Sequence, residues 1–247
     1  MGIADQPAAS ERPPAVDAAR EVVQRRFVGV HQAWLAGSVV TGVPTATSDL
    51  DITVLRPRGA VYRESIVSHG WPIELFVHTP ASVRRYVAKD VARRRPTMLR
   101  LIGSGTPLVP GGQGLDLQVE CLALLRQGPG PVAIDDLRMM RYALTDAVDD
   151  LADVGDADRT ASSVEVWRQS AELVLASARW WSGTGKWLGR ELAMLDARDG
   201  TDWAIRLNEG LRASLAGDSS PLVQAAAECL SASGGRLWEG FRADSTS

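Results

Sequence analysis

The segment Asp49-Leu50-Asp51, which opens an apolar run, constrains the fold of this 247-residue chain more than any other feature. Residues two apart in a strand project from the same face, so we expect Asp49 and Asp51 to point together. The apolar residues of this predicted strand would line the opposite face: Leu50, Ile52 and Val54. Two adjacent carboxylates repel each other and add nothing to an apolar core. They are, however, the hard oxygen ligands that suit Mg²⁺, which proteins hold by one or two carboxylates together with substrate phosphates.

A Gly37-Ser38 pair ends the preceding predicted strand, at 32–35, and ten residues separate it from Asp49. Glycine lets the backbone approach a phosphate closely, and the free N–H groups of a helix N-terminus bind anions. We therefore expect a helix to begin at or near Ser38 and the Ser38 hydroxyl to add a donor. Taken alone, a Gly-Ser pair indicates only a turn with an N-cap. Ser48, directly before Asp49, completes the phosphate-binding residues expected in this half of the chain.

Glu74 is a charged residue within 71–78, a run that otherwise suits burial. Burying a carboxylate without a partner is costly. If this strand lies beside the strand of Asp51, Glu74 joins Asp49 and Asp51 in a site of three carboxylates. The third carboxylate would then either bind metal or take a proton from an acceptor hydroxyl. The alternative is an edge strand with Glu74 facing water.

The character of the chain changes near residue 110. Before it, strands alternate with helices: a hairpin is expected around His69-Gly70, and Thr79-Pro80 has the N-cap and first-position residues of a helix. After a glycine-rich break, the sequence predicts helices at 135–154, 162–182, 186–196, 202–215 and 221–236. We therefore predict an α+β protein with a short disordered tail (1–15), an N-terminal domain with a mixed sheet flanked by helices (16–110), and an all-helical C-terminal domain (111–247).

Composition excludes several classes of protein. A hydrophobic content of 45% with 23% charged residues is that of a soluble globular protein, and no run approaches the roughly 20 apolar residues that cross a bilayer. The N-terminus lacks the apolar run of a secretory signal. A formal charge of −3 argues against a general nucleic-acid binder. Cys121 and Cys229 lie in apolar helical stretches, so we interpret them as reduced core thiols of a cytoplasmic protein.

The three-part pattern resembles the DNA polymerase β-type nucleotidyltransferase superfamily over about 34–78. The helical half is similar to that of aminoglycoside nucleotidyltransferases, which carry a nucleoside monophosphate from ATP to a drug hydroxyl. The resemblance implies that Gly37 and Ser38 hold the β- and γ-phosphates of ATP. It also implies that Asp49 and Asp51 bind one or two Mg²⁺ ions and that Glu74 is the third carboxylate.

A second, shorter resemblance concerns Gly-Thr-Gly-Lys-Trp at 183–187. It is similar to the Gly-Lys segment of streptomycin/spectinomycin adenylyltransferases, in which the lysine would face nucleotide phosphates. Lys186 stands where a helix could begin, which suits an anion. The alternative is a loop lysine in water. The segment is not a P-loop, because Trp187 stands where the hydroxyl residue would be.

The expected function is Mg²⁺-dependent transfer of a nucleoside monophosphate, AMP from ATP, to a hydroxyl of a small acceptor, with release of pyrophosphate. The resemblance suggests an aminoglycoside-like acceptor and a role in antibiotic resistance. Two alternatives stay open: an AMP-transferring toxin or antitoxin that acts on protein or RNA, and a non-catalytic relative that binds nucleotide. The three carboxylates disfavour the non-catalytic relative, and the helical domain favours a small acceptor. Membrane and nucleic-acid partners are not expected, and the sequence leaves the oligomeric state open.

Overall fold

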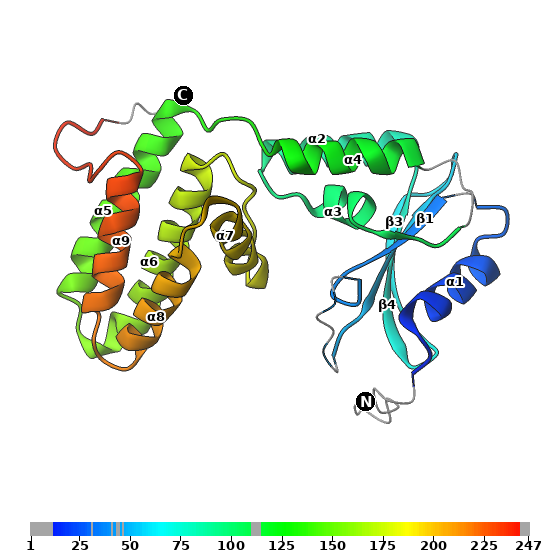
Figure 1. The fold of residues 1–247 in the computed structure, drawn as a ribbon, viewed down its shortest axis with the longest axis horizontal. Coiled ribbons are helices and arrows are strands. Elements are labelled where there is room, and N and C mark those ends of the chain that lie inside the picture. Colours follow the sequence, from blue (N-terminus) through cyan, green and yellow to red (C-terminus); the bar gives the residue numbers. More distant parts are fainter. Residues whose placement is uncertain are drawn as a thin grey trace. The chain divides into compact units, whose positions relative to one another are not determined.

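The protein forms two compact units, Met1–Gln127 and Gly128–Ser247. The structure is a computed structural model that describes residues 12–30, 32–40, 42, 45, 47–109 and 115–242. The first unit, drawn from blue to green in Figure 1, combines a sheet with helices, and the second is helical. This confirms the predicted α+β fold class. Residues 1–11 of the predicted tail lie outside the described residues.

A mixed five-stranded sheet is the centre of the first unit, with the strand order β3-β4-β2-β1-β5. The strands β2 and β4 pair in parallel, whereas β1–β2, β1–β5 and β3–β4 are antiparallel. The predicted strand of Glu74 therefore does lie beside that of Asp51. The bounds are β1 (Gln32–Ala36), β2 (Leu50–Leu55), β3 (Tyr62–Ser68), β4 (Trp71–His78) and β5 (Thr106–Pro107).

One face of this sheet is apolar and is covered by α1 (Ala15–Arg26). Alternate residues of the central strands point to this face, as the period of two in a strand requires. Each buried aliphatic side chain contributes about 1.5–3 kcal/mol, so this face anchors the two central strands firmly. The buried residues are Leu50, Ile52 and Val54 of β2, Ile73, Leu75 and Val77 of β4, and Ala18, Ala19, Val22 and Val23 of α1.

The opposite face carries Trp34 and Thr53, which are partners across β1 and β2 and are both buried. The short helix α3 (Thr97–Gly103) contacts these two strands, and Figure 1 shows α1 and α3 on opposite sides of the sheet. Neither α3 nor β5 was expected from the sequence. The Asp90 carboxylate fixes the first turn of α3. Its Oδ2 accepts hydrogen bonds from the Met98 and Leu99 N–H groups, at 2.5 and 3.1 Å.

The helix α2 (Pro80–Ala92), which contains Asp90, follows β4. It begins as predicted: the Thr79 side chain accepts the Ser82 N–H, and the Ser82 hydroxyl accepts the Thr79 N–H. Such a reciprocal capping box satisfies two helix-end donors. Asp90 is fully buried, and this burial raises its pKa although Arg93 and two N–H groups partly compensate the charge.

The first unit extends to Gln127 because it includes α4 (Leu115–Gln127). A Cβ at Gly103 would lie 2.9 Å from the backbone nitrogen of Leu122, so only glycine allows α3 and α4 to cross this closely. The sequence-based boundary at 110 therefore falls inside the first compact unit. The glycine-rich segment that suggested it contains residues 110–114, which lie outside the described residues.

The second unit packs its helices around an apolar core that includes Leu144, Val166, Leu192 and Leu222. The predicted helices are all present, with ends that differ by a few residues. No helix in the described part of the chain is both long and apolar enough to cross a membrane. The helices are α5 (Ile134–Ala152), α6 (Asp156–Ser177), α7 (Lys186–Asp199), α8 (Trp203–Leu215) and α9 (Ser220–Ala232).

The two cysteines are free and buried, as predicted. Burial raises the pKa of Cys121 to about 11 and that of Cys229 to about 12. Both thiols are therefore protonated at neutral pH, and the thiolate is the reactive form of cysteine. They act as core residues, one in each unit.

Candidate metal and phosphate site

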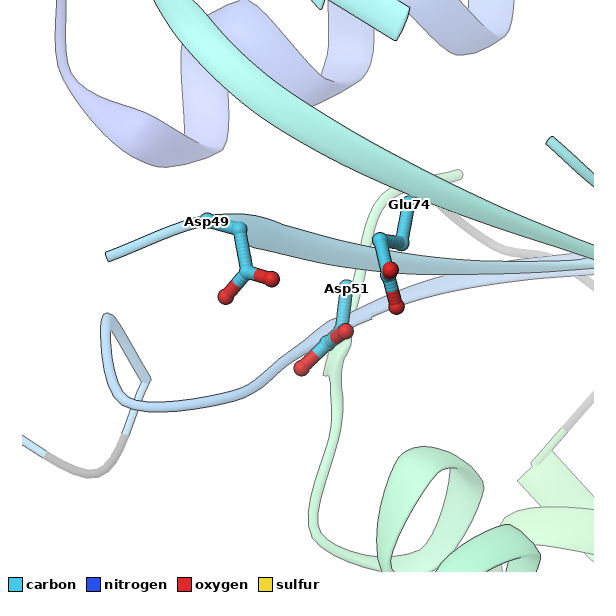
Figure 2. Close-up of side chains that lie close together, drawn as sticks. All are labelled: Asp49, Asp51 and Glu74. Carbon is cyan, nitrogen blue, oxygen red and sulfur yellow. The ribbon is translucent and has the colours of Figure 1, made fainter. Parts of the chain in front are cut away.

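Three carboxylates converge on the face of the sheet opposite α1. Asp51 and Glu74 are partners across the parallel strands β2 and β4, so their side chains leave the same face. Asp49 directly precedes β2, and Figure 2 shows its carboxylate beside the other two. One oxygen of each residue lies within 4.8 Å of one oxygen of each of the others. The sequence-based expectation that these three side chains lie together is therefore met.

The donor set fits a Mg²⁺ ion. Metal–oxygen distances of 2.0–2.1 Å place the oxygens of an octahedral site about 3–4.2 Å apart. The limit of 4.8 Å between the carboxylate oxygens is close to that span, so each residue would offer one oxygen to a shared ion. All three residues are partly buried, which leaves them open to an ion and to a substrate. Asp49, Asp51 and Glu74 would hold it.

Gly37 lies against this cluster, and its backbone has φ +90°. A Cβ at this position would lie 2.7 Å from Oδ2 of Asp51, so the positive φ favours glycine and any side chain here would displace the Asp51 carboxylate. Residues 37–40 form a turn in which the Val40 N–H donates to the Gly37 carbonyl at 3.1 Å. The prediction of a helix beginning at or near Ser38 is thus wrong, because Gly37 directs the chain into a turn.

The hydroxyls of Ser38 and Ser48 are 2.7 Å apart and join the two ends of the loop between β1 and β2. The Ser48 hydroxyl also accepts the Thr45 N–H at 2.8 Å, and Ser48 is only 6% exposed. The buried Ser48 hydroxyl therefore helps to fix the position of the Ser38 hydroxyl. The contact of either hydroxyl with phosphate stays a prediction.

Arg63 of β3 is a site residue that the sequence analysis missed. Its Nη2 group donates to both carboxylate oxygens of Glu74, and its guanidinium lies 5.3 Å from the centroid of the Phe76 ring. The hydrogen bond to Glu74 raises the pKa of Arg63, and the charges of Asp51 and Asp49 add to this effect. The alternation of side chains in 62–68 does not show from the sequence which face of the sheet Arg63 occupies. The pairing of β3 with β4 places it on the same face as Glu74.

Lys186 belongs to the second unit, where it is the exposed first residue of α7. Gly185, with φ +53°, turns the chain into this helix. The expected helix start is therefore confirmed. The predicted contact between Lys186 and nucleotide phosphates stays a prediction.

No family model and no curated protein matches this chain. Among solved structures, the chain is similar to a nucleotidyltransferase-like protein from Exiguobacterium sibiricum 255-15. The similarity has a TM-score of 0.36 and 10% sequence identity, and it covers 88% of this chain and 80% of that chain. This level of similarity is too low to assign a family, so the function has to be inferred from the side chains of the site.

Proposed function

We propose that this protein is a metal-dependent nucleotidyltransferase that transfers a nucleoside monophosphate from a nucleoside triphosphate, AMP from ATP, to an acceptor hydroxyl. The observation that supports the proposal is the convergence of Asp49, Asp51 and Glu74 beside the turn at Gly37 and Ser38. Three carboxylates on one sheet face repel one another, which is costly unless a cation shares them. Mg²⁺ is usually bound by one or two carboxylates together with substrate phosphates, which fits this arrangement.

In the proposed reaction, the oxygen of the acceptor hydroxyl forms a bond to the α-phosphorus, and the bond from that phosphorus to the bridging oxygen of pyrophosphate breaks. Bound Mg²⁺ would supply charge neutralisation at the phosphate oxygens and at the leaving group. Asp49 and Asp51 would hold one or two such ions. The Gly37 backbone and the Ser38 hydroxyl would orient the β- and γ-phosphates, and most of the rate gain would come from positioning.

Glu74 has two candidate roles, as a third metal ligand or as the group that accepts the proton of the attacking hydroxyl. Both of its oxygens accept hydrogen bonds from Arg63. Either role therefore requires that the pair with Arg63 opens or rearranges. Lys186, at the exposed start of α7, stays a proposed phosphate-binding residue.

The proposed acceptor is a small hydroxyl-bearing molecule, with an aminoglycoside-like compound as the first to test.

The proposal is tested by incubating the protein with α-labelled ATP, Mg²⁺ and a panel of aminoglycosides, and separately with tRNA or a protein extract. We expect label in a new small-molecule product and an equal amount of pyrophosphate. Label on RNA or protein would retain the chemistry and change the acceptor class. Magnesium-dependent ATP binding without transfer to any acceptor would contradict a transferase function.

A further inference from the structure

The edge strand β3 carries two successive charged residues, each in an arginine–glutamate pair, on opposite faces of the sheet. Arg63 donates from Nη2 to both oxygens of Glu74 on the carboxylate face. Glu64, the next residue, accepts from Nη2 of Arg26 at 3.0 Å on each oxygen, on the face covered by α1. The two pairs have the same chemistry, and only the first one borders a cluster of carboxylates.

The pair of Arg63 and Glu74 competes with any ion that the cluster binds. An ion shared by Asp49, Asp51 and Glu74 needs an oxygen of Glu74, and Arg63 already donates to both of them. A guanidinium and a divalent cation also repel each other at such distances. Binding of a metal ion by Glu74 therefore displaces Arg63, at least in part.

Arg63 can leave Glu74 without disturbing the core. Its side chain is 62% exposed, whereas that of Glu74 is 25% exposed. The guanidinium also lies 5.3 Å from the centroid of the Phe76 ring, two residues from Glu74 on the same face of β4. A guanidinium released from Glu74 would have this ring and the adjacent carboxylate face within reach. Its planar fork of donors matches two phosphate oxygens.

We propose that Arg63 is a positioning residue that exchanges partners. It holds Glu74 until a divalent ion takes that carboxylate, and it then contacts the phosphates of the nucleotide. This inference rests on the proposed function, because it assumes that the cluster binds metal and nucleotide together. The exchange couples the two ligands: metal binding releases the guanidinium that the nucleotide needs, so each ligand strengthens the binding of the other.

The first test measures binding of Mn²⁺ alone to the full-length protein, from the electron paramagnetic resonance signal of free Mn²⁺ at constant ionic strength. We expect Arg63→Gln to bind Mn²⁺ about three- to tenfold more tightly than the unmodified protein, because the competing cation is gone. Arg26→Gln is the matched control: it breaks the equivalent pair with Glu64 and changes the charge equally, so its affinity stays within about twofold. Unchanged or weaker binding by Arg63→Gln would overturn the proposal.

The second test measures binding of a non-hydrolysable ATP analogue with and without saturating Mg²⁺. We expect Arg63→Gln to weaken analogue binding by about tenfold with Mg²⁺ and by much less without it. Arg63→Lys, which keeps the charge and loses the fork, should lie between the two. Equal losses with and without Mg²⁺ would show a fixed phosphate contact and contradict the exchange.

Asp51→Asn separates this inference from the function on which it rests. If Asp51→Asn leaves Mn²⁺ binding unchanged, the proposed metal site itself fails. If Asp51→Asn removes Mn²⁺ binding while Arg63→Gln behaves like the unmodified protein, only the exchange fails. Circular dichroism and thermal melting of each variant show whether it is folded.

Discussion

The two faces of the central strands share one backbone and have opposite chemistry. On the α1 face, Ile52 and Leu75 are completely buried among apolar side chains. On the other face, one residue earlier in each strand, Asp51 and Glu74 place carboxylates side by side. Repulsion between two charges 4 Å apart costs about 1 kcal/mol in water and about 4 kcal/mol at a protein surface. Burial of each aliphatic residue on the α1 face contributes about 1.5–3 kcal/mol of stability. This contribution offsets the repulsion between the carboxylates on the other face.

The largest expected effect is on catalysis, from Asp51→Asn on the carboxylate face. Turnover in the labelled-ATP assay should fall by at least about a thousandfold, or on the order of 4 kcal/mol of barrier, because a metal ligand is lost. The melting temperature without metal should stay the same or rise, since a repulsive charge is removed. Glu64→Gln, on the opposite face, is the control and should keep its turnover within about twofold. Near-normal turnover by Asp51→Asn would exclude it as a ligand.

The next largest effect is expected on the apolar face, where a substitution should change stability and leave metal binding unchanged. Leu75→Ala should lower the free energy of unfolding by about 2–5 kcal/mol, because it leaves a cavity between the sheet and α1. Urea unfolding measures this change, and Mn²⁺ affinity of the folded fraction should change little. Val67→Ala, at a position 68% exposed on β3, should cost less than about 0.5 kcal/mol. Similar losses for both variants would contradict the division between the faces.

A smaller effect is expected where the turn meets the carboxylates. Gly37→Ala should cost about 1–3 kcal/mol of stability through its positive φ, and it should also weaken Mn²⁺ binding, because the new Cβ displaces the Asp51 carboxylate. Gly29→Ala has a similar φ, +73°, but its Cβ would meet nothing within 4 Å. The control should therefore lose stability and keep its Mn²⁺ affinity. Equal Mn²⁺ affinities for the two variants would disprove the close approach of Gly37 to Asp51.

The smallest effect concerns His78, at the end of β4, where the carboxylate face becomes buried. Burial lowers the pKa of His78 from 6.5, and the charge of Arg85 lowers it further. The unfolded chain then binds this proton more readily than the folded protein. The free energy of unfolding is therefore highest above about pH 6.5 and falls as the pH drops toward the lowered pKa. His78→Gln should reduce this fall between about pH 7.5 and about pH 5.5 in urea unfolding, and an identical fall in both proteins would argue against the assignment.

The strand period alone predicted that Asp49 and Asp51 point together, whereas the inclusion of Glu74 depended on which strands pair. Asp49 and Asp51 are two residues apart, and Glu74 lies in the next strand of apolar character, which pairs in parallel with β2. The sequence left this pairing open, because β3 lies between β2 and β4 along the chain, and the structure shows that it forms. The expectation of three converging carboxylates therefore holds, while their roles remain proposals.

The features that sequence reasoning missed depend on contacts between distant segments. Arg63 looks like any exposed arginine until the pairing of β3 with β4 places it beside Glu74. The helix α3 has only seven residues, and it is fixed by the buried carboxylate of Asp90 from another helix. The helix expected at Ser38 is replaced by a turn at 37–40, in which Gly37 has φ +90°. Local propensity shows none of these contacts.

The charged residues of the site lie on strands that differ in their number of neighbours in the sheet. Asp51 and Glu74 lie on interior strands that have neighbours on both sides, whereas Arg63 lies on the edge strand β3. A substitution or insertion in β3 disturbs one ladder, and one in β2 or β4 disturbs two. A change at Arg63, on the edge strand, is therefore expected to disturb the sheet less than a change at Asp51 or Glu74.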